Sequence, residues 1–288
     1  MLAARRIDID TVRTVCLALG PYRNLTTLTG SLLFLHPNCQ VLNHAGPRIF
    51  GDPRIDFLAE YDRERFHNFV RYAVQIAKKG RRGRYGGSIT HSHAFAQKHK
   101  TGTVLRSAAG KRVKRDIRCL FWKESLRTAN HIREHGTDLD EILSRNKRLR
   151  FLLPIRHPLD CAVSNLKTGH VDLFPNLDRR ANLPAVVDGI LDEFAWFFDL
   201  EQRWPDRFFH FFEHGFDRAM LADLADFLQL PRDGGWMDRA VEAFEIKSGY
   251  EHDRKLVEHF RTGVARRFGD RPEIAEPLVA FVADEDRD

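Results

Sequence analysis

One short segment of the sequence carries residue types suited to holding an anion. Residues 19–28 (LGPYRNLTTL) lie between an apolar run and a helical pattern. Where a strand, a tight loop and a helix start follow one another, backbone N–H groups point outward and the helix dipole favours negative charge. Thr26 and Thr27 add hydroxyl donors, and Arg23 adds a forked cation. The segment predicts a phosphate site, and the alternative is a plain helix cap formed by the threonines.

The same segment departs from the phosphate loop of nucleotide triphosphatases, G-x-x-x-x-G-K-(S/T). Counted from Gly20, the second glycine falls on Leu25 and the lysine falls on Thr26, so only Thr27 fits. No predicted strand ends in an apolar run followed by Asp, so the acid that holds magnesium in such enzymes is missing too. We expect the loop to bind phosphate without running ATP hydrolysis.

A second and more specific segment spans residues 152–165 (LLPIRHPLDCAVSN). Arg156 ends an apolar run, and Ser164 lies two turns into the helix that Pro158 is well placed to start. An arginine and a hydroxyl converging on one group suit a terminal phosphate monoester. The alternative is that Arg156 pairs with Asp160 and Ser164 lies on the helix surface.

The elements that position these segments follow from short apolar runs that alternate with helical patterns. The predicted strands are Val12–Leu19, Cys39–Asn43, Ser88–His93, Arg118–Lys123, Leu149–Ile155 and Phe208–Phe212. The predicted helices are Leu25–Leu35, about Asp56–Lys78, Arg127–Glu134, one from Pro158, Leu183–Arg203, Phe216–Leu228, Trp236–Phe244 and Lys255–Phe268. This alternation predicts an α/β fold with a central parallel sheet, whose ligands bind at the carboxyl ends of the strands. No low-complexity linker divides the chain, so we expect one domain over residues 1–288.

Together the two segments resemble the motifs of sulfotransferases that use 3′-phosphoadenosine 5′-phosphosulfate (PAPS). Residues 23–28 (RNLTTL) are similar to the family's 5′-phosphosulfate loop, K-S-G-T-T-x, with Arg23 for Lys and Leu25 for Gly. Residues 156–164 (RHPLDCAVS) match its 3′-phosphate motif, R-(N/D)-P-x-D-x-x-x-S, at Arg, Pro, Asp and Ser with the same spacing. Residues 227–231 (FLQLP) resemble the family's F-L-x-L-P helix end. The resemblance covers roughly residues 12–231.

The resemblance implies a three-layer, P-loop-like fold and transfer of a sulfuryl group from PAPS to an acceptor hydroxyl. Because no predicted strand is followed by an Asp that could hold magnesium, we expect this transfer to need no metal. The acceptor it suggests is a carbohydrate or a lipid-linked hydroxyl. The cofactor-binding residues it implies are Arg23, Asn24, Leu25, Thr26, Thr27, Leu28, Arg156 and Ser164. Arg261 and Gly263 resemble a remnant of the family's late R-K-G segment, and a surface helix is the alternative there.

Three residues at predicted strand ends are candidates for the chemistry: His44, His93 and Lys123. In several branches of the family a catalytic Glu lies near the position of His44, and a K-T-H segment resembles residues 91–93 (HSH). Lys123 resembles the start of a K-(S/T)-P segment. We expect His44 to be the general base and His93 to be a positioning contact, with Glu124 as the next candidate if neither matters. The alternative for each is a structural or exposed side chain.

Composition places the chain among ordinary globular proteins, with 43% hydrophobic and 30% charged residues. A net charge of +6 favours an anionic partner such as a nucleotide, nucleic acid or an anionic lipid surface. Its four cysteines stand singly in apolar segments, which favours buried thiols over disulfides or a zinc site. With no apolar signal core and no membrane-length apolar run, we expect a cytoplasmic protein.

Two other functions fit parts of the pattern: a P-loop-type nucleotide kinase, and a basic nucleic-acid-binding domain. The missing lysine and magnesium acid argue against the kinase. The basic runs Lys78–Arg84 and Lys111–Arg118 lack interleaved aromatic residues apart from Tyr85, which argues against nucleic acid. The expected partners are a nucleotide donor and a hydroxyl-bearing small molecule or glycan. Contact with a membrane surface and the oligomeric state stay open.

Overall fold

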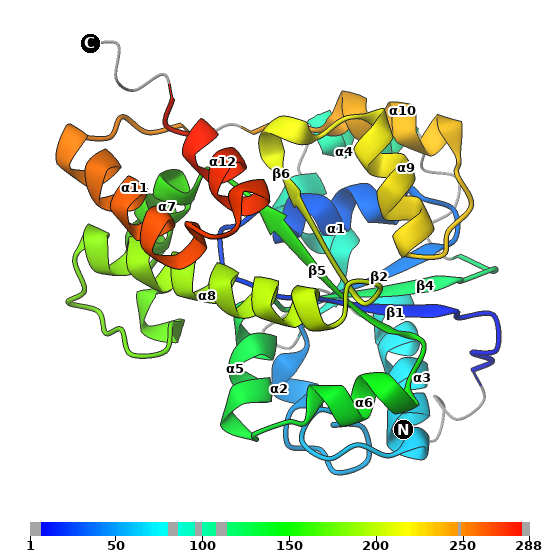
Figure 1. Ribbon diagram of the computed structural model, residues 1–288. Coiled ribbons are helices and arrows are strands. Elements are labelled where there is room, and N and C mark those ends of the chain that lie inside the picture. Colours follow the sequence, from blue (N-terminus) through cyan, green and yellow to red (C-terminus); the bar gives the residue numbers. More distant parts are fainter. Residues whose placement is uncertain (1–6, 80–85, 96–99, 108–113, 247–248, 284–288) are drawn as a thin grey trace.

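A six-stranded sheet runs through the centre of the molecule in the order β3-β2-β4-β1-β5-β6 (Figure 1). The computed structural model describes residues 7–79, 86–95, 100–107, 114–246 and 249–283. Its strands are β1 Thr14–Ala18, β2 Cys39–Asn43, β3 Gly87–Ser88, β4 Cys119–Lys123, β5 Leu149–Ile155 and β6 Phe208–Phe212. β3 pairs antiparallel with β2, whereas the other pairings are parallel. The predicted α/β class is confirmed, with one short strand reversed.

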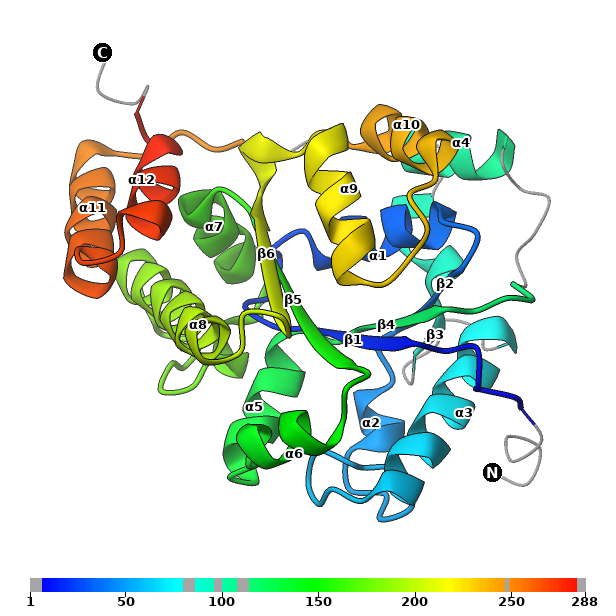
Figure 2. The same ribbon diagram turned by 45° about the vertical axis from the view of Figure 1, so that its right-hand side comes forward.

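Helices cover both faces of this sheet, and Figure 2 shows α1, α9 and α10 on one side and α3, α5 and α6 on the other. The helices are α1 Thr26–Leu35, α2 Gly46–Ile49, α3 Arg63–Lys79, α4 Lys100–Ser107, α5 Leu126–Glu134, α6 Leu139–Arg145, α7 Pro158–Thr168, α8 Leu183–Arg203, α9 Arg218–Phe227, α10 Gly234–Ala243, α11 Arg254–Phe268 and α12 Pro272–Ala280. α11 packs against α8 and α12. The three layers explain why the strands are apolar throughout rather than alternating.

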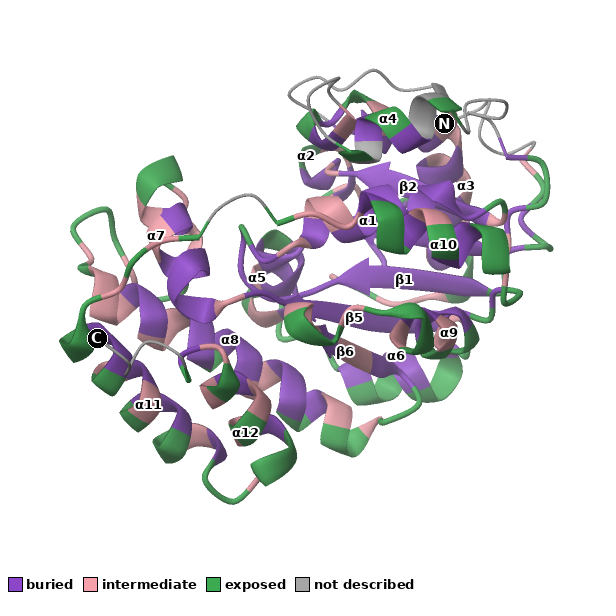
Figure 3. Ribbon diagram, turned by 90° about the horizontal axis from the view of Figure 1, so that it is seen from above, coloured by how far each residue is buried: buried purple, intermediate pink, exposed green. Residues whose placement is uncertain are grey.

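Strand β1 shows how the side chains divide between the two faces. Val15 and Leu17 belong to one hydrophobic cluster, whereas Cys16 and Ala18 belong to the other. This is the period of two expected for a strand that is buried on both sides. Figure 3, coloured by burial, shows β1 and β5 buried along their length. Truncating a residue such as Leu17 to Ala would cost about 2–5 kcal/mol of stability.

Most predicted elements are present, and three strands, Cys39–Asn43, Leu149–Ile155 and Phe208–Phe212, have the predicted bounds. The strand expected over Ser88–His93 is wrong. β3 stops at Ser88 because the Ser88 side chain accepts a hydrogen bond from the N–H of Thr90 and starts a 3-10 turn, Ile89–His91. A second 3-10 turn, His93–Phe95, follows it.

The helix expected from about Asp56 begins later, at Arg63. The Asp56 carboxylate accepts hydrogen bonds from the N–H groups of Gly51 and Ala59, which folds this stretch into turns. Asp62 then accepts from the N–H of Arg65 at 2.7 Å, as a residue preceding a helix often does. Helices α2, α4, α6 and α12 were not predicted.

The state of the cysteines and the length of the apolar helices were both expected from composition. Cys16, Cys39, Cys119 and Cys161 are all free and buried, as predicted. Among the helices of the described ranges, none combines the length and the apolar character that a membrane span requires. Of the basic run of residues 78–84 the structure describes residues 78 and 79, and of the run of residues 111–118 it describes residues 114–118.

Candidate functional site

The predicted site residues gather at one edge of the sheet, because β1, β2, β4 and β5 run parallel and end on the same side. The loop of residues 19–25 follows β1, His44 follows β2, Lys123 ends β4 and Arg156 follows β5. This is the edge where ligands of open α/β sheets bind.

Non-glycine residues with a positive φ angle are concentrated at this edge of the sheet. Positive φ angles occur at Arg23 (62°), Leu25 (59°), His44 (60°), Ala45 (91°) and Ser125 (53°), all beyond the ends of parallel strands. Each such conformation costs a non-glycine residue about 1–2 kcal/mol. Strain of this kind persists only where the surroundings enforce it, and it clusters at functional sites.

Asn24 helps to hold the loop after β1 in its strained conformation. Its Oδ1 accepts a hydrogen bond from the N–H of Arg156 at 2.9 Å, and its Nδ2 donates to the carbonyl of Pro154 at 2.5 Å. The side chain is fully buried. Asn24 therefore fixes the first motif to the start of the second. Because its side chain is engaged in this way, the predicted contact of Asn24 with an anion would be made by its main chain. Leu25, which takes the left-handed conformation, occupies the position where the family loop has Gly.

A second set of contacts fastens the same loop to α7. The carbonyl of Tyr22 accepts from Asn165 Nδ2 at 2.8 Å and from the Cys161 thiol at 3.3 Å. Gly20 has a φ of 85°, and a Cβ there would lie 2.3 Å from Cδ1 of Leu153. The tight turn and close approach thus require glycine at position 20.

The two predicted anion motifs meet directly. Arg23 Nε donates a hydrogen bond to Ser164 Oγ at 2.9 Å, across a separation of 141 residues. Ser164 is buried, so the alternative that placed it on a helix surface is wrong. Thr26 and Thr27 form the first turn of α1, whereas the side chain of Leu28 packs against the core. Leu28, like Asn24, can face a ligand only through its main chain.

Arg156 takes part in a buried ion pair. Its Nη2 lies 3.1 Å from Oδ2 of Asp160, so the pairing considered as an alternative does exist. Asp160 Oδ1 also accepts from His252 Nε2 at 3.0 Å and from the N–H of Tyr250 at 3.1 Å. Burial by itself would raise the pKa of Asp160, but the bond from His252 and the charges nearby lower it. The carboxylate therefore holds Arg156 and anchors the segment before α11.

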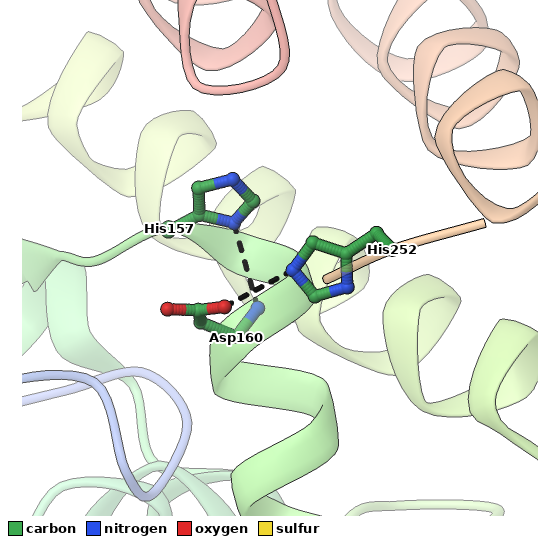
Figure 4. A group of neighbouring side chains, drawn as sticks. All are labelled: His157, Asp160 and His252. Carbon is green, nitrogen blue, oxygen red and sulfur yellow. Dashed lines mark hydrogen bonds and ion pairs between the residues drawn. The ribbon is translucent and has the colours of Figure 1, made fainter. Parts of the chain in front are cut away.

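His157, Asp160 and His252 lie close together, as Figure 4 shows. One potential ligand atom from each lies within 4.8 Å of the others, a spacing that would suit a transition metal. However, the two oxygens of Asp160 already accept from Arg156, His252 and Tyr250. We therefore interpret the group as a hydrogen-bonded network.

His157 caps α7 within this network. Its side chain accepts from the N–H of Asp160, and its ring stacks on His252 with centroids 5.2 Å apart. Burial lowers the pKa of His157 to about 4, so the imidazole is neutral near pH 7. A neutral ring keeps the lone pair that the cap requires.

The catalytic candidates His44 and Lys123 are also brought together. Lys123 Nζ lies 3.3 Å from His44 Nε2 and 5.9 Å from the centre of the Tyr22 ring. The backbone N–H of His44 donates a hydrogen bond to the carbonyl of Lys123 at 2.9 Å. The backbone carbonyl of His44 accepts one from the Trp122 indole at 2.5 Å. The main chain on both sides of the imidazole is thereby fixed.

Glu124 lies beneath this pair and is fully buried. Its Oε2 accepts from the N–H of Gly46 at 2.9 Å, and its Oε1 accepts from the Tyr22 hydroxyl at 3.4 Å. His44 Nδ1 lies 3.7 Å from the same Oε1. Burial acts to raise the pKa of Glu124, but His44, the Gly46 N–H and Lys123 together lower it. The carboxyl group is therefore ionised near pH 7.

The surroundings of the loop are electropositive. His170 stacks on Tyr22 with ring centroids 5.2 Å apart. Burial lowers the pKa of His170, and the cations Arg23, Lys123 and Arg127 lower it further. Three cations around a half-buried neutral ring create a field that favours a polyanionic ligand.

Three further candidates lie on other elements. His93 is exposed in the 3-10 turn that packs against α1 and α4. Arg261 and Gly263 lie within α11, where Arg261 Nη2 donates to the carbonyl of Val282. A Cβ at Gly263 would lie 2.8 Å from Cδ1 of Leu191, so this glycine serves helix packing.

Sequence reasoning missed four residues that build the site: Tyr22, Asn165, Tyr250 and His252. Tyr22 and Asn165 stand inside or beside the two motifs, so their position was a usable signal. Tyr250 and His252 come from a segment far along the chain, and nothing in their local pattern pointed to Asp160.

No protein-family model and no curated protein matches the chain. Among solved structures it is similar to sulfotransferase STF9 from Mycobacterium avium, with 14% identity and a TM-score of 0.45 over 94% of this chain and 78% of that one. It is also similar to mouse sulfotransferase SULT7A1 complexed with PAP, with 12% identity and a TM-score of 0.38 over 99% and 88% of the two chains. A sulfotransferase from Alicyclobacillus acidocaldarius shows 15% identity and a TM-score of 0.39 over 90% and 95%. These three solved structures are sulfotransferases.

Proposed function

We propose that the chain transfers a sulfuryl group from PAPS to an acceptor hydroxyl. The observation that carries the proposal is the 2.9 Å hydrogen bond between Arg23 and Ser164. It joins the motif expected to hold the 5′-phosphosulfate to the motif expected to hold the 3′-phosphate. A nucleotide that carries anionic groups on both the 5′ and the 3′ oxygen of its ribose is the ligand that such a double site fits.

The donor would lie along the loop and the start of α1. The N–H groups of residues 23–28 and the positive end of the α1 dipole would hold the 5′-phosphosulfate, with hydroxyl groups from Thr26 and Thr27. Arg156 and Ser164 would hold the 3′-phosphate through charge-assisted hydrogen bonds. Asp160, which is fixed by His252 and Tyr250, keeps the Arg156 guanidinium in place.

The chemistry would be an in-line displacement at sulfur. The acceptor oxygen forms a bond to sulfur while the bond from sulfur to the 5′-phosphate oxygen breaks, which leaves 3′-phosphoadenosine 5′-phosphate (PAP). His44 takes the hydroxyl proton as general base. Lys123, 3.3 Å from the imidazole, neutralises the charge that grows on the leaving phosphate. We expect no metal in this step.

A kinase would need a lysine in the loop and an acid that can hold magnesium. Glu124 does stand at a strand end, but its oxygens accept from Gly46 and Tyr22 and lie beside His44. In the basic run of residues 111–118, Lys114 is buried and its Nζ donates to the carbonyls of Phe34 and His36. This lysine is not presented to a nucleic-acid backbone. Both observations favour the sulfotransferase proposal over its rivals.

The proposal is tested by offering two labelled donors to the same pool of hydroxyl acceptors, both sugars and phenols. One donor is PAPS labelled with sulfur-35, and the other is ATP labelled with phosphorus-32 in its γ-phosphate. We expect label to pass to an acceptor from PAPS alone. Transfer from ATP alone would establish a kinase instead, and a salt-sensitive gel shift without transfer from either donor would establish a nucleic-acid-binding protein.

A further inference from the structure

His44 lies between two groups of fixed hydrogen-bonding character. The Lys123 ammonium, 3.3 Å from Nε2, has three donors and no acceptor. Glu124 Oε1, 3.7 Å from Nδ1, belongs to an ionised carboxylate, which accepts and does not donate. Nε2 must therefore be the acceptor nitrogen, and the ring proton must be on Nδ1. The two neighbours require the same tautomer.

We infer that Glu124 is a positioning residue that keeps the His44 proton on Nδ1, so that Nε2 is the atom that takes the proton of the acceptor hydroxyl. The catalytic part of this inference rests on the proposed function. The tautomer itself rests only on the two contacts described above.

The surroundings of Glu124 hold its carboxylate in one orientation. The Gly46 N–H bonds Oε2 at 2.9 Å, and the Tyr22 hydroxyl bonds Oε1, the same oxygen that faces His44. Gly46 follows Ala45, whose φ is 91°, so the strained turn after β2 aims its N–H at the carboxylate. The strain therefore has a use, because it fixes the group that orients the imidazole.

At 3.7 Å the contact between His44 and Glu124 is electrostatic and longer than a hydrogen bond. Contacts between catalytic groups often tighten only when substrate is bound. Lys123 has a complementary role. When no PAPS is bound, its ammonium is the hydrogen-bond donor that faces His44 Nε2. A phosphate arriving beside Lys123 would draw the ammonium away and release Nε2 as the base.

The first test measures the tautomer directly by nitrogen-15 NMR of the histidine rings, with the His44 signals assigned from a His44→Gln variant. We expect Nε2 of the neutral ring to be unprotonated and Nδ1 to be protonated. Because the Lys123 ammonium also favours an unprotonated Nε2, the effect of Glu124 is measured in a Lys123→Met chain, where the preference should persist, and in Lys123→Met combined with Glu124→Gln, whose amide both donates and accepts, where it should be lost. A protonated Nε2 in the unsubstituted chain, or the same tautomer in these two variants, would overturn the inference.

Glu193→Gln is the matched control, because Glu193 is also a buried carboxylate, paired with Arg133 at 2.5 Å. It should leave the His44 tautomer unchanged. In the transfer reaction, Glu124→Gln should lower kcat by roughly 10²-fold while the Kd for PAP stays the same, as for a lost base. If PAPS is never a donor but the tautomer responds as expected, the proposed function fails and the positioning role stands. If transfer proceeds at full rate in Glu124→Gln, the positioning role fails and the function stands.

Discussion

Arg23 and Ser164 are joined by a 2.9 Å hydrogen bond from the guanidinium Nε to the serine Oγ. Arg23 belongs to the loop that opens α1, and Ser164 lies in the second turn of α7. The bond uses one N–H of the guanidinium and leaves its terminal nitrogens to meet an anion. Two segments that would each have an ordinary structural explanation thus meet in one place, where we propose that the nucleotide binds.

This bond predicts that the two residues act together on PAP. Ser164→Ala should weaken PAP binding by about 1 kcal/mol and leave AMP binding nearly unchanged, since AMP lacks the 3′-phosphate. In a double-mutant cycle with Arg23→Ala, the coupling measured by calorimetry should be about 0.5–3 kcal/mol. Ser144→Ala, on the exposed face of α6, is the matched control. Strictly additive losses would show that the contact does not serve the nucleotide.

Metal removal gives a second prediction. Because the Glu124 oxygens are taken by protein donors, we expect sulfuryl transfer to continue at an unchanged rate in EDTA. The measurement is the rate of PAP release with and without the chelator, followed by addition of Mg²⁺. Strict dependence on Mg²⁺ would move the assignment to a kinase-like mechanism.

His44 and His93 should differ in their contribution to turnover. His44 lies beside Lys123 and Glu124, so His44→Ala should lower kcat by about 10²–10⁴-fold with little change in PAP binding. His93 is exposed in a separate turn, so His93→Ala should cause a smaller loss. The reverse order of effects would identify His93 as the base. Because Glu124 is fully buried and its oxygens accept from Gly46 and Tyr22, it is not a candidate for that role.

The buried cap His157 predicts how stability depends on acid. Its pKa is about 4 in the folded chain and 6.5 when unperturbed, so between these values the unfolded chain binds a proton that the folded chain does not. Stability should therefore fall as the pH is lowered from 6.5 to 4, by about 1–3 kcal/mol from this group. His157→Asn keeps a side chain that can cap the helix and removes the titration. Chemical denaturation across this range should give a flatter profile for His157→Asn, and parallel profiles would refute the assignment.

The fold was largely predictable because its strands carry strong local signals. The apolar runs at Cys39–Asn43 and Leu149–Ile155 are bounded by turn residues and buried on both faces, so their bounds followed from sequence alone. The strand expected over Ser88–His93 was not formed, since a single side-chain cap at Ser88 turns the chain. That competition between a weak alternation and a local hydrogen bond is not visible in the pattern.

The candidate site was predictable as two motifs, but not as one surface. The spacing in residues 156–164 predicted an anion site, yet only the packing of α7 against the loop after β1 shows that Ser164 bonds Arg23. The hydrogen bond from His252 to Asp160 and the contact of Glu124 with His44 depend on tertiary structure in the same way. The single domain and the cytoplasmic location stay predictions.

The affinity of the chain for PAP beside AMP and ATP, measured by calorimetry, tests the central claim most directly. The 3′-phosphate contact with buried Arg156 should make PAP the tightest ligand, by about 1.5–3 kcal/mol over AMP. Arg156→Ala should abolish this preference, whereas Arg150→Ala, which removes a buried arginine within β5, should keep it. Equal affinity for PAP and AMP, or equal losses for both nucleotides in Arg156→Ala, would contradict the account.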